Sequence, residues 1–423
     1  MVYRKYREIK QWGKINTKLY KRAAKAYNKI PLPKFEVPEA VKAAGVVVHN
    51  PNDPSFWKQF EASKPLPEGA LHPALAAPVI QTHPLYNTTP AYVFESFEPF
   101  SDGVDQACNL INAVKIEGLP KAVTEVQHNL LRNTAEEDVR DCILQGERYD
   151  PTLEKLERRH DKILFWVSHP VLHGTPVLKR NNIILEALYR KVLLAAVKEG
   201  QLNGLRSDRD QYISATLTTG RFAEAPLIIR GQPHLVVQAD KPLVPWAKPD
   251  EIEASKGQTV PSVAPIDPLI DLSLSNLYNG TALVPRANIP GLFIDTLLTT
   301  RQQSQKYPWT TEQNAANAIV QCFGAALAQA TRNLRRDKIA ELGELKEPVV
   351  AKTVQLVDGR LDLVAVQLNN LNLEAGNGEA KNFVWYEKGL RLYKPKPFWE
   401  NMDTVEELNM DAFHQFVALL LKR

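Results

Sequence analysis

Alternating apolar and polar positions are most regular near the end of the chain. The runs EPVVAKTVQLV and RLDLVAVQL are rich in β-branched residues and are joined by Asp358 and Gly359, a turn sequence typical of two-residue β-hairpins. NFVWY predicts a further strand, and the pattern over residues 411–421 predicts a closing helix. Upstream, Thr310 and Gln313 have capping-box spacing ahead of apolar positions at helical intervals, so a helix is expected to begin there.

The earlier part of the body alternates between helical and strand patterns. AYVFESF and YISATLTT predict strands, and PLIIR and HLVVQ, separated by GQP, predict a hairpin. The predicted helices cover residues 102–116, 120–133, 178–199 and, as a short one, 249–256. Together these elements predict an α+β fold with a mixed, mainly antiparallel sheet and packed helices, preceded by a basic helical arm and a proline-rich extended segment.

The first residues predict an amphipathic helix over 13–29, ended by Pro31. At 100° per residue, one arc of the helix collects cations and a neighbouring arc collects apolar side chains. The cationic arc holds Lys10, Lys14, Lys18, Lys21, Arg22, Lys25 and Lys29. The apolar arc holds Trp12, Ile15, Leu19, Ala23, Ala26 and Ile30. Like charges at i,i+4 destabilise an isolated helix, so the arm is expected to order against a partner.

Residues 31–90 contain eleven of the thirty prolines, which excludes long helices and central strands. Aromatic residues such as Trp57 and Phe60 distinguish this segment from a polar linker and predict that it lies along a surface. We therefore divide the chain into an arm (1–34), a proline-rich segment (35–89), a mainly helical part (90–205) and an α+β part (206–423).

Charge separates the arm from the rest of the chain. Residues 1–34 hold 11 of the 52 Lys and Arg residues and one of the 48 Asp and Glu residues. The remainder holds 41 basic and 47 acidic residues and is mildly acidic. Such asymmetry indicates a nucleic-acid or membrane partner for the arm. No run of eighteen apolar residues is present, so no membrane span is expected.

Candidate catalytic chemistry is nearly absent from the sequence. It contains no G-x-S-x-G, H-E-x-x-H, P-loop or kinase signature, and Gly376-Asn377-Gly378 is better explained as a turn than as a dinucleotide loop. His169 and His173 have i,i+4 spacing, but Pro170 interrupts a helix. The three cysteines are widely spaced, which is typical of buried small apolar residues. We expect no enzyme activity, no cofactor and no metal site.

The arm is therefore the candidate nucleic-acid-binding element. Lysines at helical spacing can meet phosphates, and aromatic faces can stack on unpaired bases. The predicted RNA-binding residues are Arg4, Lys5, Arg7, Lys10, Trp12, Lys14, Lys18, Lys21, Arg22, Lys25 and Lys29. Three alternatives stay open at this point: a mitochondrial presequence, a membrane-surface helix and a solvated basic tail.

Several stretches of the body resemble one known family when taken in order. They are His83–Tyr86, Lys115–Pro120, Glu251–Lys256 followed by Pro265–Leu272, Phe323–Ala330, Glu347–Val350 and Val366–Leu373. In this combination the chain resembles the mitochondrial large-ribosomal-subunit protein thirty-seven family, which has a paralogue of the programmed-cell-death type. Upstream of His83 only Trp12-Gly13 matches, so no RNA contact is transferred from the family.

The resemblance implies a structural, non-catalytic constituent of the mitochondrial ribosome in the matrix. Its implied partners are large-subunit ribosomal RNA and other large-subunit proteins, the paralogue among them. The alternative is a mitochondrial RNA-modifying or RNA-processing enzyme that uses the arm as a tether, which a pocket lined by convergent polar groups would favour.

Overall fold

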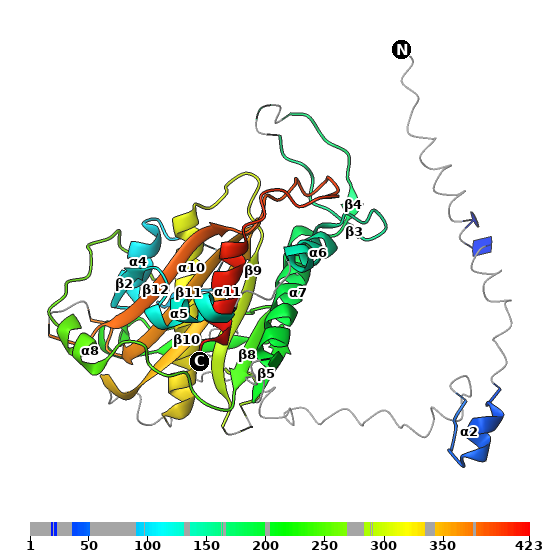
Figure 1. The fold of residues 1–423 in the computed structure, drawn as a ribbon. Helices are drawn as coiled ribbons and strands as arrows, with labels where there is room; N and C mark the ends of the chain where they lie inside the picture. The colour runs from blue at the N-terminus through cyan, green and yellow to red at the C-terminus, as the bar shows by residue number, and fades with distance from the viewer. Residues whose placement is uncertain are drawn as a thin grey trace. The chain divides into compact units, whose positions relative to one another are not determined.

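The computed structural model separates into two compact units, Met1–Ala76 and Ala77–Arg423 (Figure 1). The structure describes residues 18–19, 21–22, 36–50, 90–96, 98–130, 136–161, 163, 166–198, 204–268, 283–287, 289, 291–334, 343–374 and 378–423. Within the first unit, residues 39–43 form the short helix α2 (Glu39–Ala43), which buries no side chain. The remaining elements belong to the second unit.

A seven-stranded sheet forms the centre of the second unit, in the order β2-β12-β11-β10-β9-β8-β5. Its strands are β2 (Ala113–Glu117), β5 (Leu205–Arg209), β8 (Leu235–Ala239), β9 (Phe293–Arg301), β10 (Glu344–Val357), β11 (Arg360–Asn370) and β12 (Asn382–Arg391). Neighbouring strands are antiparallel except in the pairs β9–β10 and β2–β12. The sheet is thus mixed and mainly antiparallel, which confirms the predicted α+β class.

The hairpin predicted at Asp358-Gly359 is confirmed by strands β10 and β11, whose register runs from Val357↔Arg360 up the ladder. Asp358 has φ 50° and Gly359 has φ 70°, and positive φ at both central residues is the geometry of a type I′ turn. A Cβ at Gly359 would lie 2.7 Å from the Tyr393 carbonyl oxygen. Glycine is therefore required at this position by both conformation and space.

Both faces of the central sheet are buried. On β11, Val364 and Val366 belong to one hydrophobic cluster, whereas Leu363 and Ala365 belong to the other. This is the alternation of a pleated strand. All of β11 except Arg360 is buried, because helices or a second sheet cover each side. The near-continuous apolar runs of the sequence are the consequence.

One face of the sheet packs on α10 (Thr311–Asn333), which also contacts the second sheet through β6 and β7. That sheet has the order β1-β7-β6, with β1 (Tyr92–Phe94), β6 (Ile213–Leu217) and β7 (Leu227–Gly231). The predicted capping box at Thr310 and Gln313 is confirmed in both directions. Gly324 allows close packing, since a Cβ there would lie 2.5 Å from Ile229 Cγ2.

Helices cover the opposite face of the sheet, as Figure 1 shows for α11 and α7. They are α5 (Lys121–Leu130), α6 (Glu136–Glu147), α7 (Val177–Lys198) and α11 (Met410–Leu421). The remaining elements are α4 (Gly103–Leu110), which packs on α10, α8 (Pro249–Ser255), the short 3-10 helix η3 (Gly220–Phe222) and the two-residue strands β3 (Glu154–Lys155) and β4 (His173–Gly174). The predicted helices over 120–133, 178–199, 249–256 and 411–421 are confirmed within a few residues.

The hairpin predicted from PLIIR and HLVVQ is wrong. Both strands exist, but β7 pairs with β1 and β6, whereas β8 pairs with β5 and β9 of the seven-stranded sheet. The connecting residues Gln232 and Pro233 thus carry the chain from one sheet to the other. Proline has no backbone N–H to donate to a strand ladder, which suits a crossing segment.

The helix predicted over residues 102–116 is wrong in its second half. Helix α4 ends at Leu110, and Asn112 takes φ 47°, a conformation that asparagine tolerates better than most residues. Asn112 Nδ2 also donates to the Glu374 carbonyl oxygen at 2.8 Å. Residues 113–117 then form β2, which pairs with β12.

Candidate nucleic-acid interface

Three of the eleven predicted RNA-binding residues fall on described positions of the arm. Lys18, Lys21 and Arg22 are helical and exposed, and Leu19 of the apolar arc is helical and 56% exposed. The helical conformation expected at these four positions is therefore present. The others lie outside the described residues: Arg4, Lys5, Arg7, Lys10, Trp12, Lys14, Lys25 and Lys29. Binding of RNA by the arm stays a prediction.

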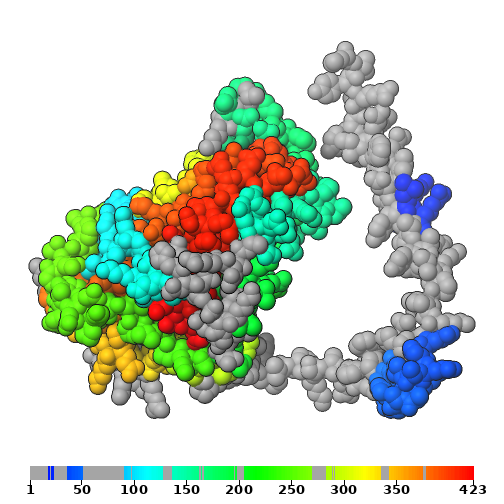
Figure 2. Space-filling view, in the orientation of Figure 1, coloured from blue at the N-terminus to red at the C-terminus, as the bar shows by residue number. Residues whose placement is uncertain are grey.

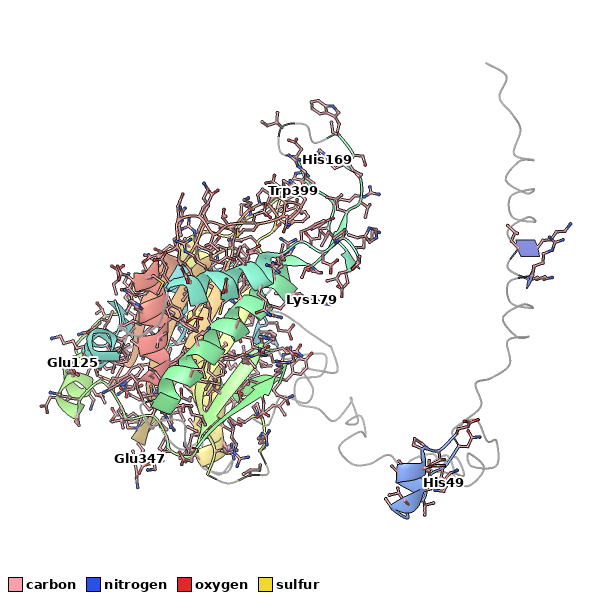
Figure 3. All side chains as sticks on the ribbon, turned by 45° about the vertical axis from the view of Figure 1, so that its right-hand side comes forward. His49, Glu125, His169, Lys179, Glu347 and Trp399 are labelled. Carbon is pink, nitrogen blue, oxygen red and sulfur yellow. The ribbon has the colours of Figure 1, made fainter. Side chains whose placement is uncertain are left out.

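Three loops of the second unit meet at one end, which we call the hairpin end. It comprises the described residues of 148–175, 302–309 and 394–401. Tyr149 N donates to Asn401 Oδ1 at 3.3 Å, and the Arg159 guanidinium lies 4.4 Å from the centre of the Trp399 ring. Figure 2 shows the teal and orange-red segments in contact there, and Figure 3 places His169 and Trp399 at that end.

A buried polar network fixes the base of the hairpin end. Arg180 of α7 donates to the Thr175 and Phe398 carbonyl oxygens at 2.9 and 2.7 Å. Its guanidinium also lies 3.5 Å from the Glu147 carboxylate, which accepts a 2.5 Å hydrogen bond from the Tyr393 hydroxyl. Burial raises the pKa of Glu147, although both partners oppose that shift. The network therefore ties α6, α7 and the residue that follows β4 to the loop after β12.

Residues 302–309 form a closed loop that is hydrogen-bonded to the segment between β3 and β4. Gln303 and Trp309 bond each other twice, since the Gln303 side chain accepts from Trp309 N at 3.0 Å and donates to Trp309 O at 3.1 Å. Gln305 accepts from His160 N at 2.8 Å and donates to the Arg158 carbonyl oxygen at 3.3 Å. These bonds hold Lys306 and Tyr307 at the tip of the loop, where both side chains are exposed.

The enzymatic alternative would need convergent polar groups in a pocket. A cavity of about 250 Å³ is lined in part by Asp358, Arg360 and Asp362. Asp362 is buried, and its two oxygens accept hydrogen bonds from Gly389 N at 2.8 Å and from the Gln355 side chain at 3.0 Å. Gln355 in turn donates to the Asn314 carbonyl oxygen of α10 at 2.9 Å. This carboxylate thus joins α10, β10 and β12, which is a structural task.

Asp362 is expected to make the free energy of unfolding depend on pH. Burial raises its pKa to about 6, although the bonds from Gly389 and Gln355 oppose the shift. An unfolded aspartate titrates near pH 4, so between about pH 4 and pH 6 the folded protein binds more protons and stability falls as pH rises. Asp362→Asn is expected to remove about 2–3 kcal/mol of this pH-dependent change. Urea unfolding at pH 4.5 and 7 measures this difference in the free energy of unfolding. The control is Asp403→Asn, because Asp403 is exposed. Equal pH dependence in the wild type and in Asp362→Asn would contradict the raised pKa of Asp362.

The other candidate chemistry is accounted for by burial and backbone geometry. Cys108, Cys142 and Cys322 are buried and free, as predicted, and burial raises the pKa of Cys108 and Cys322 to about 12. His173 lies in β4, so it shares no helix with His169. Over the described part of the chain, no group of three metal-ligating side chains was found, and no helix has the length and apolar character to cross a membrane.

The hairpin end was not predicted from the sequence. Its three loops are separated from one another by more than eighty residues, and ERRHDK within the first loop mixes acids with its cations. The strand signal is also weak, since β3 and β4 pair over only two residues each. Only the tertiary structure brings these loops together.

Comparison with known proteins adds an independent observation. The chain is 28% identical to large ribosomal subunit protein mL37 of Rattus norvegicus over 386 residues, covering 86% of this chain and 83% of that protein. It is 27% identical to mL37 of Bos taurus over 378 residues, covering 84% and 81%. The chain is thus similar to mL37 proteins along most of its length. It is also 26% identical to mL37 of Mus musculus over 367 residues.

No model of a protein family matches the chain. The likeness to mL37 proteins therefore rests on pairwise similarity, which covers more than four fifths of the chain in each of these three comparisons. A match of this extent cannot arise from one shared motif. This extent agrees with the ordered stretches from which the family resemblance was first inferred.

Proposed function

We propose that this protein is a structural constituent of the large subunit of the mitochondrial ribosome. The observation that carries the proposal is the similarity to mL37 of rat and cattle along most of both chains. The fold is compatible with this role, because buried titratable groups such as Asp362 and Glu147 join neighbouring elements.

The charge distribution supports different binding partners for the arm and the body. The arm carries 11 of the basic residues, whereas residues 35–423 have six more acidic than basic residues. Neutralising phosphates with lysines releases counterions and favours binding to RNA. We therefore propose that the basic arm binds ribosomal RNA and that the body mainly contacts neighbouring proteins.

The proposed location is the mitochondrial matrix, where the large subunit would be found. The proposed protein neighbours are other large-subunit proteins, including the paralogue of the programmed-cell-death type. A constituent of this kind works by position, since it holds RNA and proteins together, and needs no catalytic residue or cofactor.

Affinity purification of the tagged full chain from mitochondria tests the proposal against the enzymatic alternative. The expected result is recovery of large-subunit ribosomal RNA and many large-subunit proteins in comparable amounts. Recovery of precursor or transfer RNAs without the large-subunit proteins would contradict the structural role and support an RNA-acting enzyme.

A further inference from the structure

The hairpin end concentrates exposed cations and aromatic side chains on an otherwise acidic body. Its described residues include seven Lys or Arg and five Asp or Glu, whereas the body as a whole has a net charge of −6. Two of its acids are engaged, since Glu154 pairs with Lys179 and Glu157 accepts from Gln305. The described part of this end therefore has a net positive charge, which favours the approach of a polyanion.

Several of these cations have no carboxylate partner among the described residues. They are Arg148, Lys155, Arg158, Lys306 and Lys396. All but the half-buried Lys396 are exposed. Cations without a carboxylate partner in the described part of the chain can contact phosphate oxygens, and these five come from all three loops of the hairpin end.

Exposed aromatic residues lie in the same loops. Trp166 is 67% exposed and Tyr307 is 79% exposed. Tyr307 is presented by the closed loop, whose ends are fixed by the Gln303–Trp309 bonds, so little ordering is required for it to bind. Exposing a large aromatic face to water is unfavourable, and stacking on an unpaired base removes that face from water.

We propose that the hairpin end is a second RNA-binding surface, which takes unpaired nucleotides by stacking on Trp166 and Tyr307 and by phosphate contacts to Arg158 and Lys306. The proposal rests on the proposed ribosomal function for the identity of its RNA. A protein partner is the less favoured occupant. Ile163 (81% exposed) and Val167 (41%) add apolar area, but apolar contact would not explain the five cations that lack a carboxylate partner among the described residues.

The arm serves as an internal control in the test. Purified full-length protein is cross-linked by ultraviolet light to an oligouridylate of about twelve nucleotides, a length that covers one single-strand site. Mass spectrometry then maps the cross-linked peptides. We expect cross-links in peptides that contain Trp166 and Tyr307, separate from those of the arm.

Charge reversal tests whether those cross-links depend on the hairpin end. In the double variant Arg158→Glu with Lys306→Glu, cross-links at Trp166 and Tyr307 should fall roughly tenfold, because two phosphate contacts become repulsive. Arm cross-links should be unchanged. The matched control, Lys241→Glu with Lys346→Glu, alters two exposed cations elsewhere; Figure 3 shows Glu347, next to Lys346, far from His169 and Trp399.

The neutral variant Arg158→Gln with Lys306→Gln should give a smaller loss of cross-linking. No cross-link at the hairpin end in the wild type, or equal losses in the test and control variants, would overturn the proposal. If the Glu double variant no longer sediments with the large subunit but still cross-links at Trp166 and Tyr307 as the wild type does, the proposal is overturned in favour of a protein partner. Cross-linking at this end by a chain that does not sediment with large subunits would instead refute the ribosomal function and leave the RNA-binding surface standing.

Discussion

Replacing Lys352 by methionine is expected to lower the free energy of unfolding by about 3–5 kcal/mol, the effect of breaking a buried ion pair on one side. Lys352 lies on β10 and is fully buried. Its Nζ lies 2.8 Å from Asp295 Oδ1 and donates to the carbonyl oxygens of Leu419 and Lys422 at 3.1 and 2.9 Å. One ammonium group thus satisfies a buried carboxylate and the C-terminal end of α11.

The physical reason is the isolation of Asp295 after the substitution. Burial lowers the pKa of Lys352, and Asp295 opposes that shift by favouring the charged form. Methionine matches the length of lysine but leaves the carboxylate with Arg423 Nε at 3.5 Å as its remaining cation. The last carbonyl groups of α11 also lose their donor, so the helix is expected to detach from the sheet more easily.

Urea unfolding followed by circular dichroism measures this effect. The matched control is Lys346→Met, because Lys346 lies on the same strand but is exposed, and a surface change of this kind alters stability by about 0.5 kcal/mol or less. Asp295→Asn added to Lys352→Met should restore part of the loss by removing the uncompensated charge. Equal midpoints for Lys352→Met and Lys346→Met would show that the buried pair contributes nothing.

Charge reversal in the arm is the second large effect that we expect. Changing Lys14, Lys18, Lys21 and Lys25 to Glu should weaken binding to large-subunit RNA roughly a hundredfold or more near 0.1 M salt. The dependence of log affinity on log salt should also become shallower by about 3 to 4. The same four positions changed to Gln should give a smaller loss, because glutamine removes attraction without adding repulsion.

Filter binding over a range of salt concentrations distinguishes these cases. The control variant changes four exposed cations of the body to Glu: Lys121, Arg206, Lys241 and Lys346. It should retain most of the affinity and the salt dependence of the wild type, although its net charge changes by the same amount. Equal effects of the Glu and Gln variants of the arm would indicate that the lysine arc faces solvent in the complex.

Local signals explain which elements could be predicted from the sequence. The Asp358-Gly359 turn, the Thr310–Gln313 capping box and the apolar spacing of α7 and α11 depend on neighbouring residues, and all four features are present. Strand β2 was missed because its pairing partner β12 lies more than 250 residues away. Periodicity alone cannot separate a short strand from the end of a preceding helix.

Long-range placement explains the remaining differences. The sequence shows that PLIIR and HLVVQ are strands, but their assignment to different sheets depends on β9 and β6, which lie elsewhere in the chain. The hairpin end depends even more on long-range placement. Its cations and aromatic residues form one surface only because Gln305 bonds to His160 and Arg159 packs on Trp399. The basic arm, by contrast, could be recognised from composition because eleven Lys or Arg residues lie within its 34 residues.

Sucrose-gradient fractionation of mitochondrial extracts is the most direct measurement of the proposed function. We predict that the full chain sediments with the large subunit, stays with it in moderate salt, and shifts to the top of the gradient after ribonuclease treatment. Deletion of residues 1–30 should reduce the fraction that travels with the particle. Sedimentation of the intact chain as a free protein, in an extract whose large subunits are intact, would contradict the assignment.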